Sequence, residues 1–246
     1  MKTHGLFHAI FLCASLSAQA APIVYSDSTF DLDDYTQQRY QAFPVLGTVV
    51  QTAQGNPGTA VEVSYASNDT VDIVQGLFRG DFSYNPVISG ALGGIDVSLD
   101  RYFSPARDGV ALGVGSFTLR TFVVQGGQVY QAVQTFAGLP AGSTDQYVTL
   151  TAANLGAADF GLYDFSTNVL DMSINPDFAQ ALYFGFGMRA SDNVAGFKEG
   201  TLRADNWHLT LNPANSVPEP GTLALWAIAA VGLLALRRRP ATTRAA

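Results

Sequence analysis

Acidic side chains are the residues of this sequence best suited to catalysis. Hydrolysis of a sugar bond needs two carboxyl groups about 5 to 10 Å apart that flank the bond. Residues 31–34 hold three aspartates, and Asp96 and Asp100 are four residues apart. Between the two ends of the chain, glutamate occurs only as Glu62 and Glu199, neither of them in a cluster of acids. We expect most of these acids to lie at turns or on exposed strand faces and to serve solubility, so the sequence favours a protein that is not an enzyme.

Nucleophilic catalysis has equally little support in the sequence. His208 is the single histidine after residue 20, and no nucleophile-elbow motif surrounds a serine, so no catalytic triad can be assembled. The one cysteine, Cys13, lies in the N-terminal segment. The rest of the chain therefore has no thiol nucleophile, no disulfide and no thiolate ligand for zinc. The 113–115 segment is similar to the start of a dinucleotide-binding loop, but no helical pattern follows it.

The charge of the central part of the chain is strongly acidic. Between residues 21 and 217, eight Lys and Arg stand against 19 Asp and Glu, which gives a net charge of −11. Such an excess of negative charge opposes binding to nucleic acid or to anionic lipid. It suits a protein that must stay soluble outside the cell.

The C-terminal end carries the most specific pattern in the chain. A Pro-Glu-Pro triplet must be extended, because each proline fixes φ and lacks an N–H group. The uncharged apolar run after it has 15 residues, which predicts a helix of about 22 Å. That length is just sufficient to cross a membrane if the stems of the following arginines are included, and the arginines should stay on the cytoplasmic side. These segments are, in order, Val217, Pro218, Glu219 and Pro220, the run 222–236, and Arg237, Arg238 and Arg239.

This order of residues resembles the PEP-CTERM sorting signal of Gram-negative bacteria, in which Val-Pro-Glu-Pro, a short apolar helix and a basic cluster close the chain. The resemblance implies that an exosortase is a partner of the protein. The helix would hold the protein in the inner membrane until cleavage near the triplet releases it to the cell surface or to the extracellular matrix with its exopolysaccharide and biofilm. A C-terminal membrane anchor that is never cut is the alternative.

The N-terminal 20 residues predict a second targeting segment, a signal peptide. Lys2 begins a weakly basic start, residues 6–16 are mostly apolar, and Ala18-Gln19-Ala20 is a small-residue cleavage site. Cleavage after Ala20 would remove Cys13 with the leader. An uncleaved N-terminal anchor is the alternative, which the short apolar region disfavours.

Residues 21–211 predict one β-sandwich domain, followed by a linker at 212–217 and the sorting signal at 218–246. Short segments of alternating apolar and polar residues recur between glycines and prolines, and no long helical periodicity interrupts them. Gly126-Gly127 predicts a tight hairpin turn, since both glycines accept the positive φ that such turns require. The predicted strands are 22–30, 45–52, 59–66, 77–84, 91–99, 116–125, 128–136, 147–151, 181–189 and 202–211.

The segments 23–31 and 203–211 are similar to the first and last strands of jelly-roll modules such as carbohydrate-binding modules and concanavalin-like lectins. The resemblance implies an all-β fold, an antiparallel jelly-roll-like β-sandwich, in which these two strands lie side by side. It also implies that Asp31 and Asp205 share a structural calcium, whose remaining oxygen ligands would come from backbone carbonyls. No other cofactor is expected.

Three functions remain open from the sequence. The first is an exported, non-enzymatic protein of the surface or matrix. The second is a glycan-binding jelly roll that stacks exposed aromatic rings on sugars, and the third is a polysaccharide-active hydrolase. Most aromatic side chains should be core, Trp207 among them, because each buries a large area. The other aromatic candidates are Tyr84, Tyr102, Phe103, Tyr130, Tyr163 and Phe165.

Overall fold

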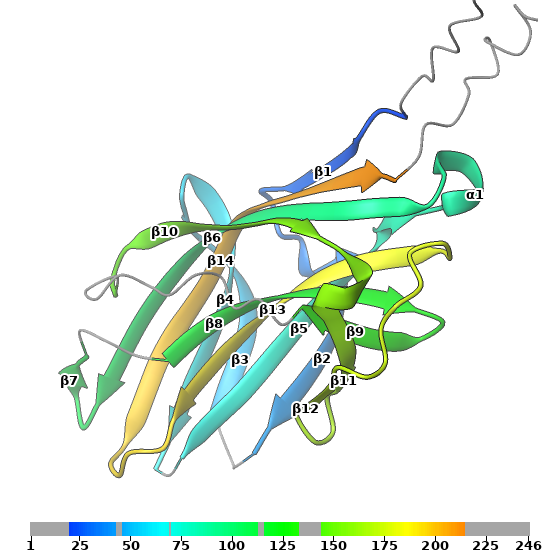
Figure 1. Cartoon of the computed structure of the whole chain (residues 1–246). Coiled ribbons are helices and arrows are strands. Elements are labelled where there is room, and N and C mark those ends of the chain that lie inside the picture. Colours follow the sequence, from blue (N-terminus) through cyan, green and yellow to red (C-terminus); the bar gives the residue numbers. More distant parts are fainter. Residues whose placement is uncertain (1–19, 43–45, 69, 113–115, 133–143, 215–246) are drawn as a thin grey trace, which may run out of the picture. The chain divides into compact units, whose positions relative to one another are not determined.

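The computed structural model describes residues 20–42, 46–68, 70–112, 116–132 and 144–214. The predicted C-terminal helix and the predicted signal peptide, apart from its last residue Ala20, lie outside these ranges. Across the described ranges, no helix is both long enough and apolar enough to cross a membrane. The only helical pieces there are the four-residue α1 (Pro86–Ser89) and the short 3₁₀ turns η1 (Leu32–Asp34) and η2 (Ala157–Asp159). The described part of the chain is therefore built from strands, as predicted (Figure 1).

Sheet A is organised around the 16-residue strand β14. Its order is β10-β6-β14-β4-β3, with β1 beside β14 and β7 beside β6, and all pairs are antiparallel. Strand β4 pairs with residues 198–204 of β14 and β1 pairs with residues 207–211, so the first and last strands are neighbours, as expected. The strands are β1 (Ile23–Asp27), β3 (Leu46–Gly55), β4 (Gly58–Ser67), β6 (Leu92–Arg107), β7 (Val110–Ala111), β10 (Tyr147–Leu155) and β14 (Lys198–Pro213).

Sheet B is the second layer of the sandwich, again antiparallel throughout. Its order is β12-β11-β9-β8-β13-β5-β2. The predicted hairpin between β8 and β9 is confirmed, because Gly126 and Gly127 both have positive φ, 58° and 83°. The strands are β2 (Tyr35–Gln41), β5 (Val71–Tyr84), β8 (Ser116–Gln125), β9 (Gln128–Ala132), β11 (Phe160–Asp164), β12 (Val169–Asp171) and β13 (Leu182–Asp192).

The main hydrophobic core lies between the two sheets. Trp207 of sheet A is fully buried, stacks on Phe82 of sheet B with ring centroids 4.9 Å apart, and meets the edge of Phe186 at 5.1 Å. The predicted inward positions Leu209 and Leu211 are also fully buried. Each aromatic ring removes roughly 150–250 Å² from water, so this cluster is the main hydrophobic link between the layers.

A buried ion pair also joins the sheets. Asp27 ends β1, and its Oδ1 accepts the backbone N–H groups of Thr29 and Phe30 at 2.8 and 2.9 Å. Its Oδ2 accepts the Tyr35 hydroxyl at 2.7 Å and the Arg79 guanidinium at 2.6 Å. Tyr35 and Arg79 belong to β2 and β5 of sheet B, so this one carboxylate in sheet A holds two strands of the opposite layer.

The hydrogen bonds decide the ionisation of Asp27. Burial alone would raise the pKa of its carboxyl, but the bonds from Tyr35, Phe30 and Thr29 outweigh burial and lower the pKa from 3.8 to about 2. A carboxylate whose pKa is lower in the folded state stabilises that state above its unfolded pKa. The contribution, roughly 2 kcal/mol for a shift of this size, is lost as the pH falls from about 4 to about 2.

We therefore expect Asp27→Asn to lower the free energy of unfolding near pH 7 by about 2–3 kcal/mol, because Tyr35, Arg79 and the 29–30 backbone lose a charged acceptor, although Arg79 keeps Asp34 and Asp81 as partners. The matched control is Asp81→Asn. Asp81 also pairs with Arg79, at 2.7 Å, but its side chain is 60% exposed, so we expect a loss of no more than about 1 kcal/mol. Urea unfolding across pH 2–7 measures both effects. Equal losses for the two variants would contradict the assigned role of Asp27.

Candidate functional site

The outer face of sheet B carries a layer of aromatic and aliphatic side chains that we call the outer aromatic layer. Phe122 of β8 lies at its centre, with ring centroids 5.4 Å from Phe78, 5.5 Å from Phe165 and 5.7 Å from Tyr163. This layer is separate from the core between the sheets. Its buried members are Val74, Phe78, Phe122, Val124, Val129 and Tyr163, and Tyr40, Phe165, Leu170 and Tyr183 pack against them.

Glycines let these rings lie flat on the sheet. A Cβ on Gly185 would approach the Phe78 ring to 2.6 Å, and a Cβ on Gly76 would approach Phe165 to 2.6 Å. A Cβ on Gly187 would collide with Phe122 in the same way. The alternation of glycine with large residues in β13, noted in the sequence as the mark of a well-packed strand, thus has a physical cause on the outer face.

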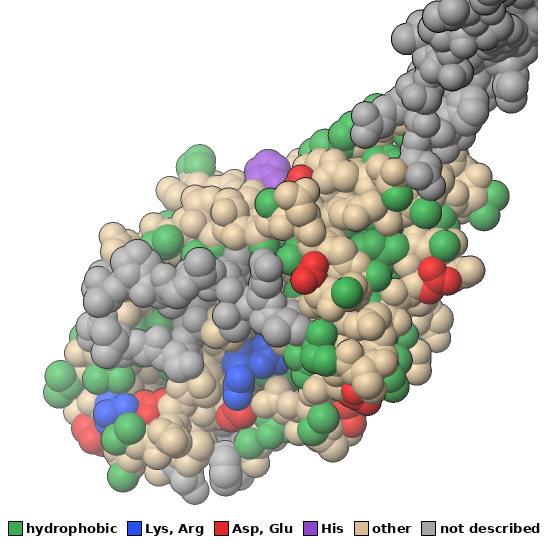
Figure 2. Space-filling model, in the orientation of Figure 1, with side chains coloured by type: hydrophobic (Ala, Val, Ile, Leu, Met, Phe, Trp, Pro, Cys, Tyr) green, Lys and Arg blue, Asp and Glu red, His purple; other side chains and the backbone are tan. Residues whose placement is uncertain are grey.

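A hollow of about 310 Å³ opens at the end of this layer and is the candidate site. Pockets that hold small ligands have volumes of about 300 Å³ and above, with a few polar groups that converge. Figure 2 shows basic side chains gathered near the middle of the visible face, with an acidic one beside them. The residues that line the hollow are Thr118, Leu119, Arg120, Gln131, Ala132, Tyr163, Asn168, Leu170 and Arg189.

Hydrogen bonds fix one side of the hollow. Arg189 donates from Nε and Nη2 to the two carboxylate oxygens of Asp72, at 2.8 and 3.1 Å. Asn168 donates from Nδ2 to the same carboxylate at 3.1 Å and accepts the Tyr163 hydroxyl at 2.7 Å. The network thus joins β5, β11 and β13 to the turn before β12. Side chains held in this way keep their geometry without a ligand, which reduces the entropy cost of binding.

Arg120 forms the other side. Its side chain is buried, its Nη1 donates to Gln131 Oε1 at 2.5 Å, and its guanidinium carbon lies 5.2 Å from the Tyr163 ring centroid. Burial lowers the pKa of Arg120, with the neighbouring Arg189 charge adding to the effect, and burial raises the pKa of Tyr163. Near neutral pH Arg120 is still a cation and Tyr163 is still a neutral phenol.

The hollow therefore offers planar hydrogen-bonding groups rather than catalytic ones. Guanidinium and amide groups can each make two parallel hydrogen bonds, and Thr118 adds a hydroxyl. None of the described lining residues is acidic, so the two carboxyl groups that glycoside hydrolysis needs are not in this hollow. This set of groups can bind a hydroxyl-rich ligand, such as a sugar, by its edges.

The two aspartates predicted to share a calcium have different surroundings. Asp31 is exposed and accepts the Asp33 N–H at 3.1 Å as the cap of η1. Asp205 is fully buried at a bulge of β14 and accepts the backbone N–H groups of Asn56 and Asn206. Burial raises the pKa of Asp205, and the nearby Asp100 acts in the same direction. No cluster of three or more His, Cys, Asp or Glu side chains suited to a metal occurs among the described residues, and the calcium remains a prediction.

The spaced pair Asp96 and Asp100 is committed to local structure. Asp96 accepts the Asn154 N–H at 2.7 Å and the Asn212 side chain at 3.0 Å. Asp100 accepts Thr149 Oγ1 at 2.5 Å and Asn206 Nδ2 at 2.8 Å. Each carboxylate thus already has at least two donors from neighbouring parts of sheet A, and Asp100 also accepts Asn56 Nδ2 at 3.4 Å.

A second, shallower recess of about 480 Å³ lies on the outer face of sheet A. A row of four hydroxyl residues crosses neighbouring strands β6, β14, β4 and β3 there, since Thr201 pairs with both Ser104 and Ser64, and Ser64 pairs with Thr48. The hydroxyls of Thr48 and Ser64 bond to each other at 2.8 Å. The described lining of this trough has hydroxyls and the carboxylate of Glu199 but no network of hydrogen-bonded planar groups, so the hollow on sheet B is the stronger candidate.

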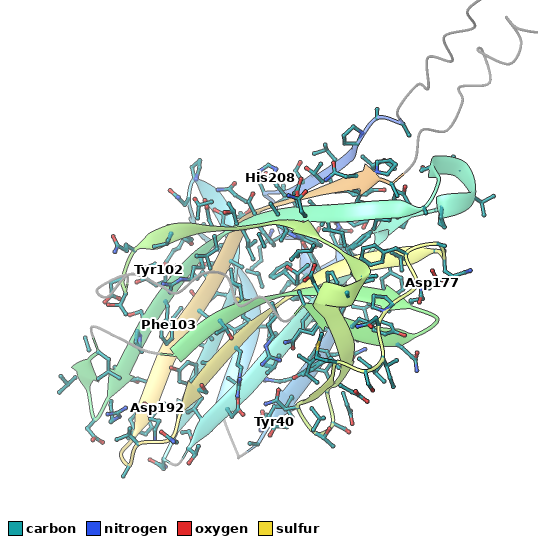
Figure 3. All side chains as sticks on the ribbon, in the orientation of Figure 1. Tyr40, Tyr102, Phe103, Asp177, Asp192 and His208 are labelled. Carbon is teal, nitrogen blue, oxygen red and sulfur yellow. The ribbon has the colours of Figure 1, made fainter. Side chains whose placement is uncertain are left out.

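The aromatic candidates are mostly buried, as predicted. Tyr84, Phe103, Tyr130 and Trp207 belong to the core between the sheets, whereas Tyr102 and Phe165 are partly exposed. His208 points outward from β14 as expected, and Figure 3 shows it far from Tyr40 on β2 of the other sheet. Of the residues that line the hollow, the sequence singled out Tyr163 alone. The sequence does hold one indication of the hollow that was not followed: each of the apolar strands β8 and β13 contains a single arginine, Arg120 and Arg189.

The predicted sorting residues 217–220 and 237–239, and Ala18 of the leader, lie outside the described residues. The chain does match the family model of the PEP-CTERM protein-sorting motif at residues 216–239. That motif implies handling by an exosortase and export through the membrane for the cell surface. No functionally curated protein matches the sequence.

Among solved structures, the chain is similar to the family 11 carbohydrate-binding module of the cellulosomal cellulase Lic26A-Cel5E of Clostridium thermocellum. The identity is 13%, the TM-score is 0.42, and the match covers 79% of this chain and 96% of the module. A family 22 carbohydrate-binding module of Clostridium thermocellum Xyn10B matches at 12% identity with a TM-score of 0.35, over 78% and 96% of the two chains. An exo-beta-agarase matches at 11% identity and a TM-score of 0.42, over 79% of this chain and 26% of the agarase.

The outer aromatic layer leads to a stability prediction. Gly187→Ala should lower the free energy of unfolding by about 1–3 kcal/mol, because its methyl group would overpack against the Phe122 ring. Gly80→Ala is the control in the same sheet, since nothing lies within 4 Å of its Cβ position, and we expect a change within about 0.5 kcal/mol. Urea unfolding of both variants decides the point. A Gly187→Ala protein as stable as the control would mean that the ring does not rest on the glycine.

Proposed function

We propose that this protein is a non-enzymatic, glycan-binding protein that an exosortase sorts to the surface or the exopolysaccharide matrix of a Gram-negative cell. The observation that carries the binding role is the hollow on sheet B, where guanidinium, amide and hydroxyl groups converge on about 310 Å³. The sorting motif at residues 216–239 supports the destination. In this proposal residues 1–20 are a signal peptide and 222–236 cross the inner membrane until processing.

The hollow suits a sugar because of the chemistry of its groups. A sugar ring offers vicinal hydroxyls, each of which can both donate and accept, and a planar amide or guanidinium can bond two of them at once. Arg120 supplies such a plane, and the amides of Gln131 and Asn168 add the hydrogen-bonding capacity that their bonds to Arg120, Asp72 and Tyr163 do not use. The apolar side chains of Leu119 and Leu170 also line the hollow. Binding by pre-held polar groups next to an apolar wall is typical of small-ligand pockets.

A hydrolase is the competing function, and the acids argue against it. The lining of the hollow holds no carboxylate among its described residues, and Asp96 and Asp100 are bonded to neighbouring strands. The acids at turns are engaged by the chain itself. Asp164 and Asp171 accept the N–H group two residues on, at 2.7 and 2.8 Å, which stabilises each turn.

The sorting proposal predicts the mass of the mature protein. In its own host, we expect an N-terminus at Ala21 and a C-terminus near residues 218–221, because the extended triplet is the segment that a processing enzyme can grip. Intact mass spectrometry of the protein from envelope and medium measures both ends. A mass that runs to Ala246 would instead establish an uncut membrane anchor.

The binding proposal predicts the effect of filling the hollow. Thr118→Trp should weaken glycan binding at least tenfold, because the indole takes the space next to Arg120 and Arg189 without removing either. A glycan array first identifies the ligand for the purified full chain, and calorimetry then compares the variant. The thermal midpoint should stay within a few degrees, since Thr118 lies on the outer face.

The matched control puts the same indole on the other sheet. Thr201→Trp fills the hydroxyl trough of sheet A, and it should leave binding unchanged. If Thr201→Trp abolished binding while Thr118→Trp did not, the trough would be the site. A chain that captures no glycan at all would reject the binding role and leave the sorting role untouched.

A further inference from the structure

Of the two arginines that line the hollow, one is paired with a carboxylate and the other is not. Two of its nine lining residues are arginines, and none of those described is acidic. Arg189 is neutralised, because Asp72 lies behind it and accepts two of its N–H groups at 2.8 and 3.1 Å. Arg120 has no such direct partner. Its described contacts are the neutral Gln131 amide and the Tyr163 ring, and Asp72, which is paired with Arg189, favours its charge without an ion pair.

This arrangement differs from that of three other arginines in the sandwich. Arg79, Arg107 and Arg203 each form an ion pair with a carboxylate, at distances of 2.6–2.7 Å, whereas Arg39 donates to the Gly47 carbonyl and forms no ion pair with a described residue. Arg120 is 8% exposed and forms no ion pair with any described residue. A guanidinium stays charged in proteins, and Arg120 lines the hollow without a direct carboxylate partner. An anion that entered the hollow would supply such a partner and form a charge-assisted hydrogen bond with it.

The surroundings of Arg120 also fix its direction. Gln131 takes up Nη1, the Tyr163 ring lies under the guanidinium, and Asn168 in turn holds the Tyr163 hydroxyl at 2.7 Å. A guanidinium has five N–H donors in a rigid plane, and that plane matches the two oxygens of a carboxylate. The guanidinium thus has a fixed plane at the wall of the hollow, and its remaining donors suit a planar anionic group.

We propose that the ligand of this hollow is an acidic glycan, and that Arg120 pairs with the carboxylate of a uronic-acid residue while the neutral groups hold the sugar hydroxyls. This inference rests on the proposed glycan-binding function and adds the chemical class of the sugar. The body's net charge of −11 would repel such a polymer at long range. That repulsion is screened beyond about 8 Å at physiological salt, whereas a pair inside the hollow is screened much less.

The experiment compares matched ligands. Oligomers of galacturonic, glucuronic and mannuronic acid are each titrated into the purified full chain beside their methyl esters, which keep the sugar and remove the charge. We expect at least one acid form to bind at least tenfold more tightly than its ester. Arg120→Gln should reduce binding of that acid form to the level of the ester, and Arg120→Lys should retain part of the difference, because it keeps the charge and loses the planar fork.

Arg203→Gln is the control, because it removes a partly buried arginine from the outer face of sheet A, and it should leave the preference for the acid form unchanged. Esters that bind as tightly as the acids, with both lost in Thr118→Trp, would overturn the acidic ligand and keep the glycan-binding function. If the protein bound only neutral glycans, the acidic ligand would likewise be overturned and the glycan-binding function kept. Failure to bind any glycan would reject the function itself. The ligand comparison needs no variant, so it decides the point even if Arg120→Gln does not fold.

Discussion

The ion pair between Asp27 and Arg79 is the constraint on which the rest of the sandwich depends. It joins the last residue of β1 in sheet A to β5 in sheet B, and the Asp27 side chain is 1% exposed. The rings of Tyr35 and Phe82 flank the guanidinium, with centroids 5.4 and 4.6 Å from its carbon. Arg79 also pairs with Asp34 and Asp81, at 3.2 and 2.7 Å, but Asp27 is the one fully buried carboxylate of the three, so its position relative to Arg79 helps to set how the two sheets stack.

A bulge in β5 directly after Arg79 determines which side chains of this strand face the core and which face outward. Tyr183 of β13 pairs with Ser83, but the next residue, Phe184, pairs with Arg79, so residues 80–82 bulge out of the ladder. The bulge turns Phe82 toward Trp207 in the core, whereas Phe78 before it packs in the outer aromatic layer. One strand thus contributes to both apolar clusters, and Tyr163 and Leu170 of the outer cluster line the hollow.

Alternation predicted the fold wherever one face of a strand is buried, as in β4 and β13, and the glycine pair predicted the β8–β9 turn. It missed β2, an edge strand with the polar run Thr-Gln-Gln-Arg, because only Tyr35 and Tyr40 pack against apolar clusters and the residues between them are mostly exposed. The hollow escaped notice for a different reason. Its residues come from β8, β9, β11, β13 and the turn before β12, and no local motif records such a convergence.

The net charge of the chain did not predict the charge of the candidate site. Many of the acidic residues serve the fold itself. Asp164, Asp171 and Asp177 lie at turns and each accept an N–H group two residues on, and other carboxylates pair with arginines. Those carboxylates keep the surface hydrated and say nothing of what the protein binds. Specific recognition is decided within a few ångströms by groups that water does not fully reach. In this sandwich that condition is met at Arg120, a buried cation whose hollow has no acidic side chain among its described lining residues, although the chain is acidic.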